Sequence, residues 1–123
     1  MRLRVSVVNM ELPLALRNYA EVRAWLAVQR FSGKVRWVNV WLRTCNGESG
    51  GPGKLCRMEA WLAKIGPVVV EHVDADPYVA IDAAAVRLKR AVASRLKTRW
   101  QKRRREMAER SLAPDRAYAE MAT

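Results

Sequence analysis

The sequence predicts an α+β domain with the element order β-α-β-β-β-α, in which a four-stranded mixed sheet carries both helices on one face. Four segments alternate apolar and polar residues with a period of two, which is typical of strands with one buried face. Two other segments repeat apolar residues at spacings of three and four, which is typical of amphipathic helices. The 123 residues, 50% of them hydrophobic, suffice for one domain with a modest core.

The first half of the chain predicts two strands joined by a helix. Arg2 to Val8 is the first strand. Leu12 to Phe31 is the helix, and Gly33 lies just past its end. Lys34 to Thr44 is the second strand, in which Val38, Val40 and Leu42 alternate with Trp37, Asn39 and Trp41. Because β-α-β crossovers are right-handed and join parallel strands, these two strands should be parallel.

The next segments predict two hairpins. A Gly-rich loop, Asn46 to Lys54, leads into the third strand, Leu55 to Ala63. On that strand Trp61 shares the face of the tryptophans of the second strand. A turn at Ile65 to Pro67 then leads into the fourth strand, Val68 to Val73.

The last helix begins at Pro77 and has two opposite faces. Asp76 suits the N-cap, and Pro77 suits the first helical position, where no amide hydrogen is needed. The apolar stripe consists of Tyr78, Ile81, Ala85, Leu88, Val92 and Leu96. The opposite, largely basic stripe consists of Arg87, Arg90, Ser94, Lys97, Gln101 and Arg104.

The apolar stripe of this helix cannot continue past Leu96. Its continuation would place Arg99 and Arg103 in the core without partners, which is unfavourable. We therefore expect a domain over residues 1–98, followed by a basic helical extension over residues 99–110. Residues 111–123 contain Pro114 and are expected to form a flexible tail.

Positive charge is concentrated on this helix. The net charge is +11 at pH 7. Residues 87–110 hold eleven Lys and Arg against Glu106 and Glu109, a net +9. This predicts a polyanionic partner, and nucleic acid in preference to a membrane, because the helix lacks a broad Trp, Phe and Leu face opposite its charges. The alternative is an ordinary solvated charged face.

The outward face of the sheet is expected to carry Trp37, Trp41 and Trp61. Basic residues alternate onto the same face, namely Arg2, Arg4, Arg43 and Arg57. Aromatic and basic side chains on an open sheet are suited to stacking single-stranded bases. Two alternatives remain: the tryptophans pack across the strands, or the face binds protein, including a second copy of this chain.

The sequence gives no pattern that predicts catalysis. Gly47 to Lys54 superficially resembles a phosphate-binding loop, but Glu48 stands where a glycine is needed and Leu55 where a Ser or Thr is needed. His72, the only histidine, has no metal-ligand spacing around it. We expect no enzyme activity, metal, cofactor or small-molecule substrate.

The chain is expected to be cytoplasmic and to have no membrane partner, because no apolar run is long enough for a secretory leader or a membrane span. Two cysteines do not make a disulfide framework. Strand alternation places Cys45 outward and Cys56 inward, so we expect them to be unbridged.

The start of the last helix resembles a known family. Asp76-Pro77-Tyr78-Val79-Ala80-Ile81-Asp82 is similar to the acid-x-Tyr-x-Ala-Ile-Asp sequence that opens the last helix of the ribosome hibernation-promoting factors, which include the ribosome-associated translation inhibitors. Leu16-Arg17, Tyr19 and the Val38, Val40 and Leu42 strand also agree. The element order is the same, so the resemblance covers about residues 1–97.

The resemblance implies a short-form, stress-responsive factor that binds the small ribosomal subunit between head and body. Such factors contact ribosomal RNA through basic residues of both helices and block the path of messenger and transfer RNA. The family's basic positions fall on Arg17, Arg23, Arg87 and Arg90. Ser94 departs from the Lys or Arg of many members, and a separate C-terminal dimerisation domain has no room. The helix-start motif itself is represented by Asp76, Tyr78 and Asp82.

The charge pattern adds a second group of expected RNA contacts. These are Lys97 and the terminal cluster Lys102, Arg103, Arg104 and Arg105. Two other functions remain open from the sequence. One is a different structured-RNA or DNA binder, and the other is a divergent relative that acts through protein contacts on the open sheet face.

Overall fold

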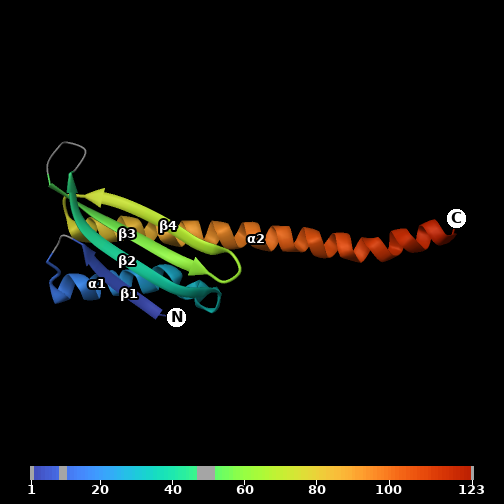
Figure 1. The fold of residues 1–123 in the computed structure, drawn as a ribbon, viewed down its shortest axis with the longest axis horizontal. Helices are drawn as coiled ribbons and strands as arrows, with labels where there is room; N and C mark the ends of the chain where they lie inside the picture. Colours follow the sequence, from blue (N-terminus) through green and yellow to red (C-terminus); the bar gives the residue numbers. More distant parts are fainter. Residues whose placement is uncertain (1, 9–10, 47–51, 123) are drawn as a thin grey trace. The chain divides into compact units, whose positions relative to one another are not determined.

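A four-stranded sheet and two helices make up the computed structural model, which describes residues 2–8, 11–46 and 52–122 (Figure 1). The predicted order β-α-β-β-β-α is confirmed. The elements are β1 (Arg2–Val8), α1 (Leu14–Val28), a short 3₁₀ segment η1 (Gln29–Lys34), β2 (Val35–Asn46), β3 (Pro52–Leu62), β4 (Gly66–Asp74) and α2 (Pro77–Ala122).

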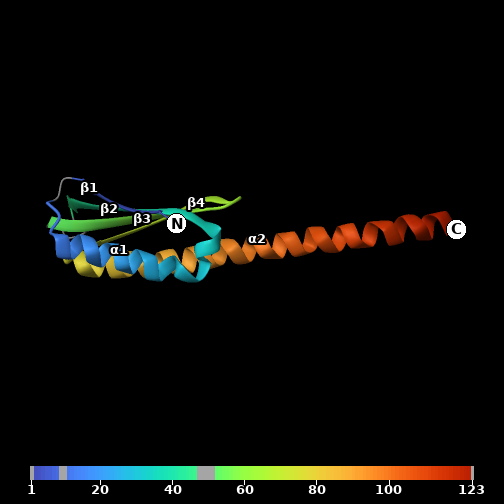
Figure 2. The same ribbon diagram turned by 90° about the horizontal axis from the view of Figure 1, so that it is seen from below.

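The strands lie in the order β1-β2-β3-β4. β1 is parallel to β2, as the crossover rule predicts, and the other two pairs are antiparallel. Both α1 and the first part of α2 lie on one side of the sheet (Figure 2). The sheet therefore has one covered face and one open face.

The core lies between the sheet and the helices. Val38, Val40 and Leu42 of β2 are fully buried, and their partners on β3, Ala60, Met58 and Cys56, are fully buried too. From the helices, α1 contributes Leu16, Ala20, Ala24, Ala27 and Val28, and α2 contributes Ala80, Ile81, Ala84, Ala85, Leu88 and Val92.

Several element boundaries differ from the sequence prediction, most clearly at the end of the first helix and in the β2–β3 hairpin. The first helix ends at Val28 and continues as η1, because Ser32 and Gly33 are weak helix formers next to the start of β2. The β2–β3 hairpin is longer than expected, since Gly53 and Lys54 pair with Cys45 and Thr44 and so belong to β3. Of the loop that resembles a phosphate-binding sequence, residues 47–51 lie outside the described residues.

The β3–β4 turn depends on two residues with positive φ. Lys64 has φ 67° and Gly66 has φ 108°, a region that glycine adopts without steric penalty. Pro67 follows in β4, which is an edge strand, where a missing backbone donor is tolerated.

The chain divides into two compact units, residues 1–93 and 94–123. In the part of α2 up to residue 110, Val92 is the last buried residue, Leu96 is half-buried, and every residue from 97 to 110 is exposed. The helix was expected to end near Arg110 but continues through Ala122, past Pro114. The residues around this proline include Leu112, Ala113, Ala117, Ala119 and Met121, which are strong helix formers and favour the helix despite the proline.

Candidate nucleic-acid interface

Asp76 caps α2 as the sequence predicts. The backbone N–H of Tyr78 donates a hydrogen bond to Asp76 Oδ1 at 2.9 Å, and the Asp76 carbonyl accepts the first helical bond from Ala80 N–H at 3.0 Å. Asp76 N–H in turn donates to Asp74 Oδ1 at 3.0 Å. These bonds fix the position at which the helix leaves β4.

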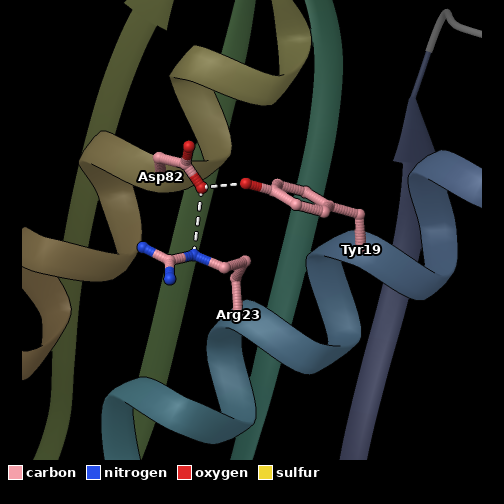
Figure 3. A network of polar contacts seen from close by, with 3 residues as sticks. All are labelled: Tyr19, Arg23 and Asp82. Carbon is pink, nitrogen blue, oxygen red and sulfur yellow. Dashed lines mark hydrogen bonds and ion pairs between the residues drawn. The ribbon is translucent and has the colours of Figure 1, made fainter.

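A polar network joins the two helices (Figure 3). The Tyr19 hydroxyl on α1 donates a hydrogen bond to Asp82 Oδ1 on α2, at 2.5 Å. Arg23 Nε lies 3.0 Å from the same oxygen, as an ion pair and not as a well-aligned hydrogen bond. The Tyr19 and Tyr78 rings also pack edge to face, with ring centroids 4.9 Å apart. Tyr19, Asp82 and Tyr78 therefore link α1 to the start of α2.

The network changes the acidity of Tyr19. Its hydrogen bond to the Asp82 carboxylate, together with desolvation, raises the pKa of the Tyr19 hydroxyl above its ordinary value of 10.0. Because the raised pKa favours the neutral hydroxyl, the stabilisation is fully present below pH 10 and is lost as the pH rises through the folded-state pKa. The link between the helices is therefore intact at neutral pH.

This arrangement gives the helix-start motif a role in the fold. Asp76 forms the cap, Asp82 accepts a bond from α1, and Tyr78 packs on Tyr19. Tyr78, expected in the inward stripe, is instead 41% exposed at the rim of the core. An edge-to-face contact needs only one side of the ring, which explains why the other side stays open.

The predicted basic residues of residues 1–93 differ in how firmly they are held. Arg87 donates from Nη1 to the Glu71 carbonyl oxygen of β4 at 2.6 Å, which orients its side chain. Arg90 is exposed. Arg17 makes an exposed pair with Glu21, 3.6 Å apart, which is a weak interaction in water. Arg23 forms an ion pair with Asp82, and its Nε atom is buried.

Lys89 is a further exposed basic residue of α2, which the sequence prediction omitted. It lines a hollow of about 180 Å³ between α1 and α2, opposite Arg23. The sequence signal was the run Arg87 to Arg90, but a stripe drawn at spacings of three and four passes over Lys89. We call Arg17, Arg23, Arg87, Lys89 and Arg90 the helical basic surface.

The second unit carries the remaining predicted contacts. Lys97, Lys102, Arg103, Arg104 and Arg105 are all exposed. Within the described part of the chain, none of the five forms an ion pair. Because these side chains form no ion pair within the described residues, they are available to neutralise the phosphates of an external polyanion.

The open face of the sheet carries the three tryptophans, as the strand alternation predicts. Trp37 and Trp61 are paired across β2 and β3 and stack, with ring centroids 5.1 Å apart. Trp41 lies under the Arg57 guanidinium at 5.3 Å. All three rings are half-buried, so part of their burial comes from packing across the strands.

Other sites are not apparent in the described residues. Over residues 2–8, 11–46 and 52–122, no group of three or more His, Cys, Asp and Glu side chains is placed to hold a metal ion. His72 is half-buried opposite Cys56 in the β3–β4 ladder.

Cys45 and Cys56 are free, and their strand partners are Gly53 and Leu42. Among the helices described, none is both long and apolar enough to cross a membrane.

Comparison with protein families identifies the chain. Residues 3–101 match the model of the family described as sigma 54 modulation protein / S30EA ribosomal protein. The chain belongs to this family. The match spans both the helical basic surface and the α1–α2 network, and it confirms the resemblance to the hibernation-promoting factors. No curated protein sequence matches the chain significantly.

Solved structures agree with the family. A ribosomal subunit interface protein from Coxiella burnetii matches with a TM-score of 0.65 and 13% identity, over 76% of this chain and 96% of the other, which supports the fold. The N-terminal domain of Thermus thermophilus Protein Y matches with a TM-score of 0.53 and 28% identity, over 72% of this chain and 88% of the other. These similarities show that the fold of this chain is shared with both solved structures.

Proposed function

We propose that this family member is a cytoplasmic hibernation factor that binds the small ribosomal subunit and inhibits translation. The observation that carries the proposal is the family match over residues 3–101, which includes both helices and their basic side chains. The similar Coxiella burnetii protein is described as a ribosomal subunit interface protein, which is consistent with this function.

The charges of the helices suit a contact with ribosomal RNA. Within residues 1–93 the helical basic surface has five positive side chains, and the acidic residues of α1 and α2 there are Glu21 and Asp82. Arg forks bind phosphate with fixed geometry, and Arg87 is already oriented by β4. The helical basic surface would therefore set the position of the protein on RNA.

The second unit would add affinity by a less specific route. Its exposed Lys97 and terminal cluster can contact phosphates without a precise geometry, since each Lys or Arg that neutralises a phosphate releases a counterion. In the proposed mechanism, the bound protein occupies the channel that messenger and transfer RNA need, and initiation is blocked by exclusion.

A binding competition tests this function. The protein is sedimented with purified small subunits, with large subunits, and with small subunits already loaded with messenger and initiator transfer RNA. We expect it to pellet with free small subunits and to be displaced by the loaded RNAs. Equal competition by an unrelated structured RNA would instead identify a general nucleic-acid binder.

A charge-matched control variant helps to interpret these experiments. Arg43→Ala combined with Lys64→Gly removes two positive charges that belong to neither helix, one in β2 and one in the turn between β3 and β4. Arg43 is exposed at the end of the open face, and glycine suits the positive φ of Lys64. This control pair should leave ribosome binding within about twofold of the parent, because exposed substitutions far from an interface change little.

A further inference from the structure

We propose that the open face of the sheet holds one nucleotide of a single-stranded RNA, in a hollow beside Trp37. The hollow has a volume of about 280 Å³ and is lined by Arg4, Arg36, Trp37 and Asn39. This volume is just below the roughly 300–1,000 Å³ that small-ligand pockets span, which suits one nucleotide better than a large cofactor.

The site is built by an irregularity in β2. The register between β2 and β3 shifts between Val35 and Trp37, so Arg36 has no regular partner on β3. Such a bulge re-aims side chains, and here Arg36 lines the same hollow as Trp37 although the two are neighbours in a strand. Arg4 reaches the hollow from β1, where it pairs with Asn39.

Trp37 provides a surface on which a base can stack. Trp37 is stacked on Trp61, with an interplanar angle of 19°, and it also lines the hollow. A base in the hollow would extend the row of flat rings from β3 through β2 toward β1. Stacking on aromatic side chains is the main means by which open sheets hold single-stranded bases.

The polar residues around the hollow match the rest of a nucleotide. Arg4 and Arg36 bring two guanidinium groups, which can bind a phosphate with paired hydrogen bonds. Neither forms an ion pair with any of the described residues. The Asn39 amide has both donors and an acceptor for a base edge. The acidic residue next to Asn39 in the ladder is Glu59, on the side away from Arg4.

Trp41, on the same face, is already in contact with Arg57, so the hollow beside Trp37 is the favoured position for a base. Arg57 covers the Trp41 ring and lies 4.0 Å from Glu71. A ligand at Trp41 would have to displace both contacts. At Trp37 no such displacement is needed, because Arg4 and Arg36 surround a hollow that is lined by no acidic residue.

The test uses a single-stranded RNA tetranucleotide and the indole N–H signals of the five tryptophans, assigned by Trp→Phe variants. Titration should shift the signals of Trp37 and Trp61. The signals of Trp25 and Trp100, which lie in helices, report binding elsewhere and should move less. An unmoved Trp37 signal at saturating tetranucleotide would overturn the proposal.

Variants distinguish binding in the hollow from unspecific attraction to positive charge. Arg4→Ala combined with Arg36→Ala should weaken tetranucleotide binding by roughly tenfold or more and lower the slope of log affinity against log salt by about 0.7 for each phosphate that is no longer neutralised. The control pair at Arg43 and Lys64 removes the same charge outside the hollow and should have a much smaller effect. Both arginines are exposed, so the fold should persist.

A third variant tests stacking itself. Trp37→Leu removes the ring, whereas Trp37→Phe keeps a smaller one, and binding should fall in the order Trp, Phe, Leu. If the Leu variant fails to fold, the arginine pair still decides the question. Equal loss in the arginine pair and the control pair would overturn the proposal in favour of unspecific charge. Broadening of the Trp37 signal with protein concentration, with no response to RNA, would overturn it in favour of a protein partner.

Discussion

Asp82 shows how a single residue can belong to a charged surface and still serve the fold. Its carboxylate accepts from the Tyr19 hydroxyl and pairs with Arg23, so it restrains one of the expected RNA contacts. Arg23 has a side-chain exposure of 34% and Asp82 of 44%, so solvent screens this pair. The hydrogen bond from Tyr19 should therefore contribute more to stability than the ion pair.

Tyr19→Phe tests this link. The variant keeps the ring contact with Tyr78 and loses only the hydroxyl, so the free energy of unfolding should fall by about 1 kcal/mol. Urea denaturation measures the change. Tyr78→Phe is the matched control and should stay within about 0.5 kcal/mol, since the Tyr78 hydroxyl has no hydrogen bond within the described residues. Equal losses in the two variants would contradict the role given to Tyr19.

Cys56 provides a second prediction at the scale of one residue. Burial raises the pKa of its thiol from 9.0 to about 12, so its thiolate fraction at neutral pH should be about a thousandfold lower than that of a free thiol. In a Cys45→Ser variant, a thiol reagent should react slowly with the native protein and rapidly in denaturant. Rapid reaction in the native state would show that the β2–β3 core opens readily.

The same shift makes stability depend on pH. The unfolded chain loses this proton near pH 9, whereas the folded protein retains it up to about pH 12. The stabilisation is therefore complete below pH 9 and is lost as the pH rises toward 12.

At the scale of the elements, α2 shows what the sequence could predict and what it could not. The N-cap, the start at Pro77 and the inward residues Ile81, Ala85, Leu88 and Val92 follow from local chemistry and helical periodicity. The continuation past Pro114 was missed, because a proline signals a stop while the propensities of its neighbours favour helix. Lys89 was missed because it lies outside the stripe drawn at spacings of three and four, and it lines the hollow between the two helices instead.

The sheet, too, was predictable from the sequence only in part. Alternation predicted which face Trp37, Trp41 and Trp61 occupy, because the side-chain period of a strand is fixed by its pleat. The bulge beside Trp37 was not predictable, since Arg36 looks like an ordinary alternating residue until the partner strand is in place. Long-range pairings such as Tyr19 with Asp82 have no local signature either.

The cap of α2 carries a prediction at this scale. Asp76→Ala should lower stability by about 1 kcal/mol, because the Tyr78 N–H loses its acceptor. Asp76→Asn should retain most of the stability, since asparagine caps helices about as well as aspartate. Chemical denaturation, with hydrogen exchange at Tyr78 as a local readout, distinguishes them. If Asn is as harmful as Ala, the carboxylate acts through its charge and not as a cap.

At the scale of the whole molecule, the two compact units are expected to make different contributions to RNA binding. Residues 1–93 contain the sheet and the buried core, whereas residues 97–110 are entirely exposed. Deleting residues 99–123 should therefore leave the fold intact, reduce ribosome affinity modestly and keep the binding site. Circular dichroism and competition with the full-length chain check these outcomes. Loss of competition would assign the binding site to the second unit.

The most direct test is the salt dependence of sedimentation with small ribosomal subunits, measured for Arg87→Ala/Arg90→Ala beside the parent and the control pair. The double variant should bind more weakly, and the slope of log affinity against log salt should fall by about 0.7 to 0.9 for each phosphate that the variant no longer neutralises. The control pair should match the parent. If the double variant sediments as well as the parent at every salt concentration, the helical basic surface is only solvated charge and the proposed ribosomal RNA contact is wrong.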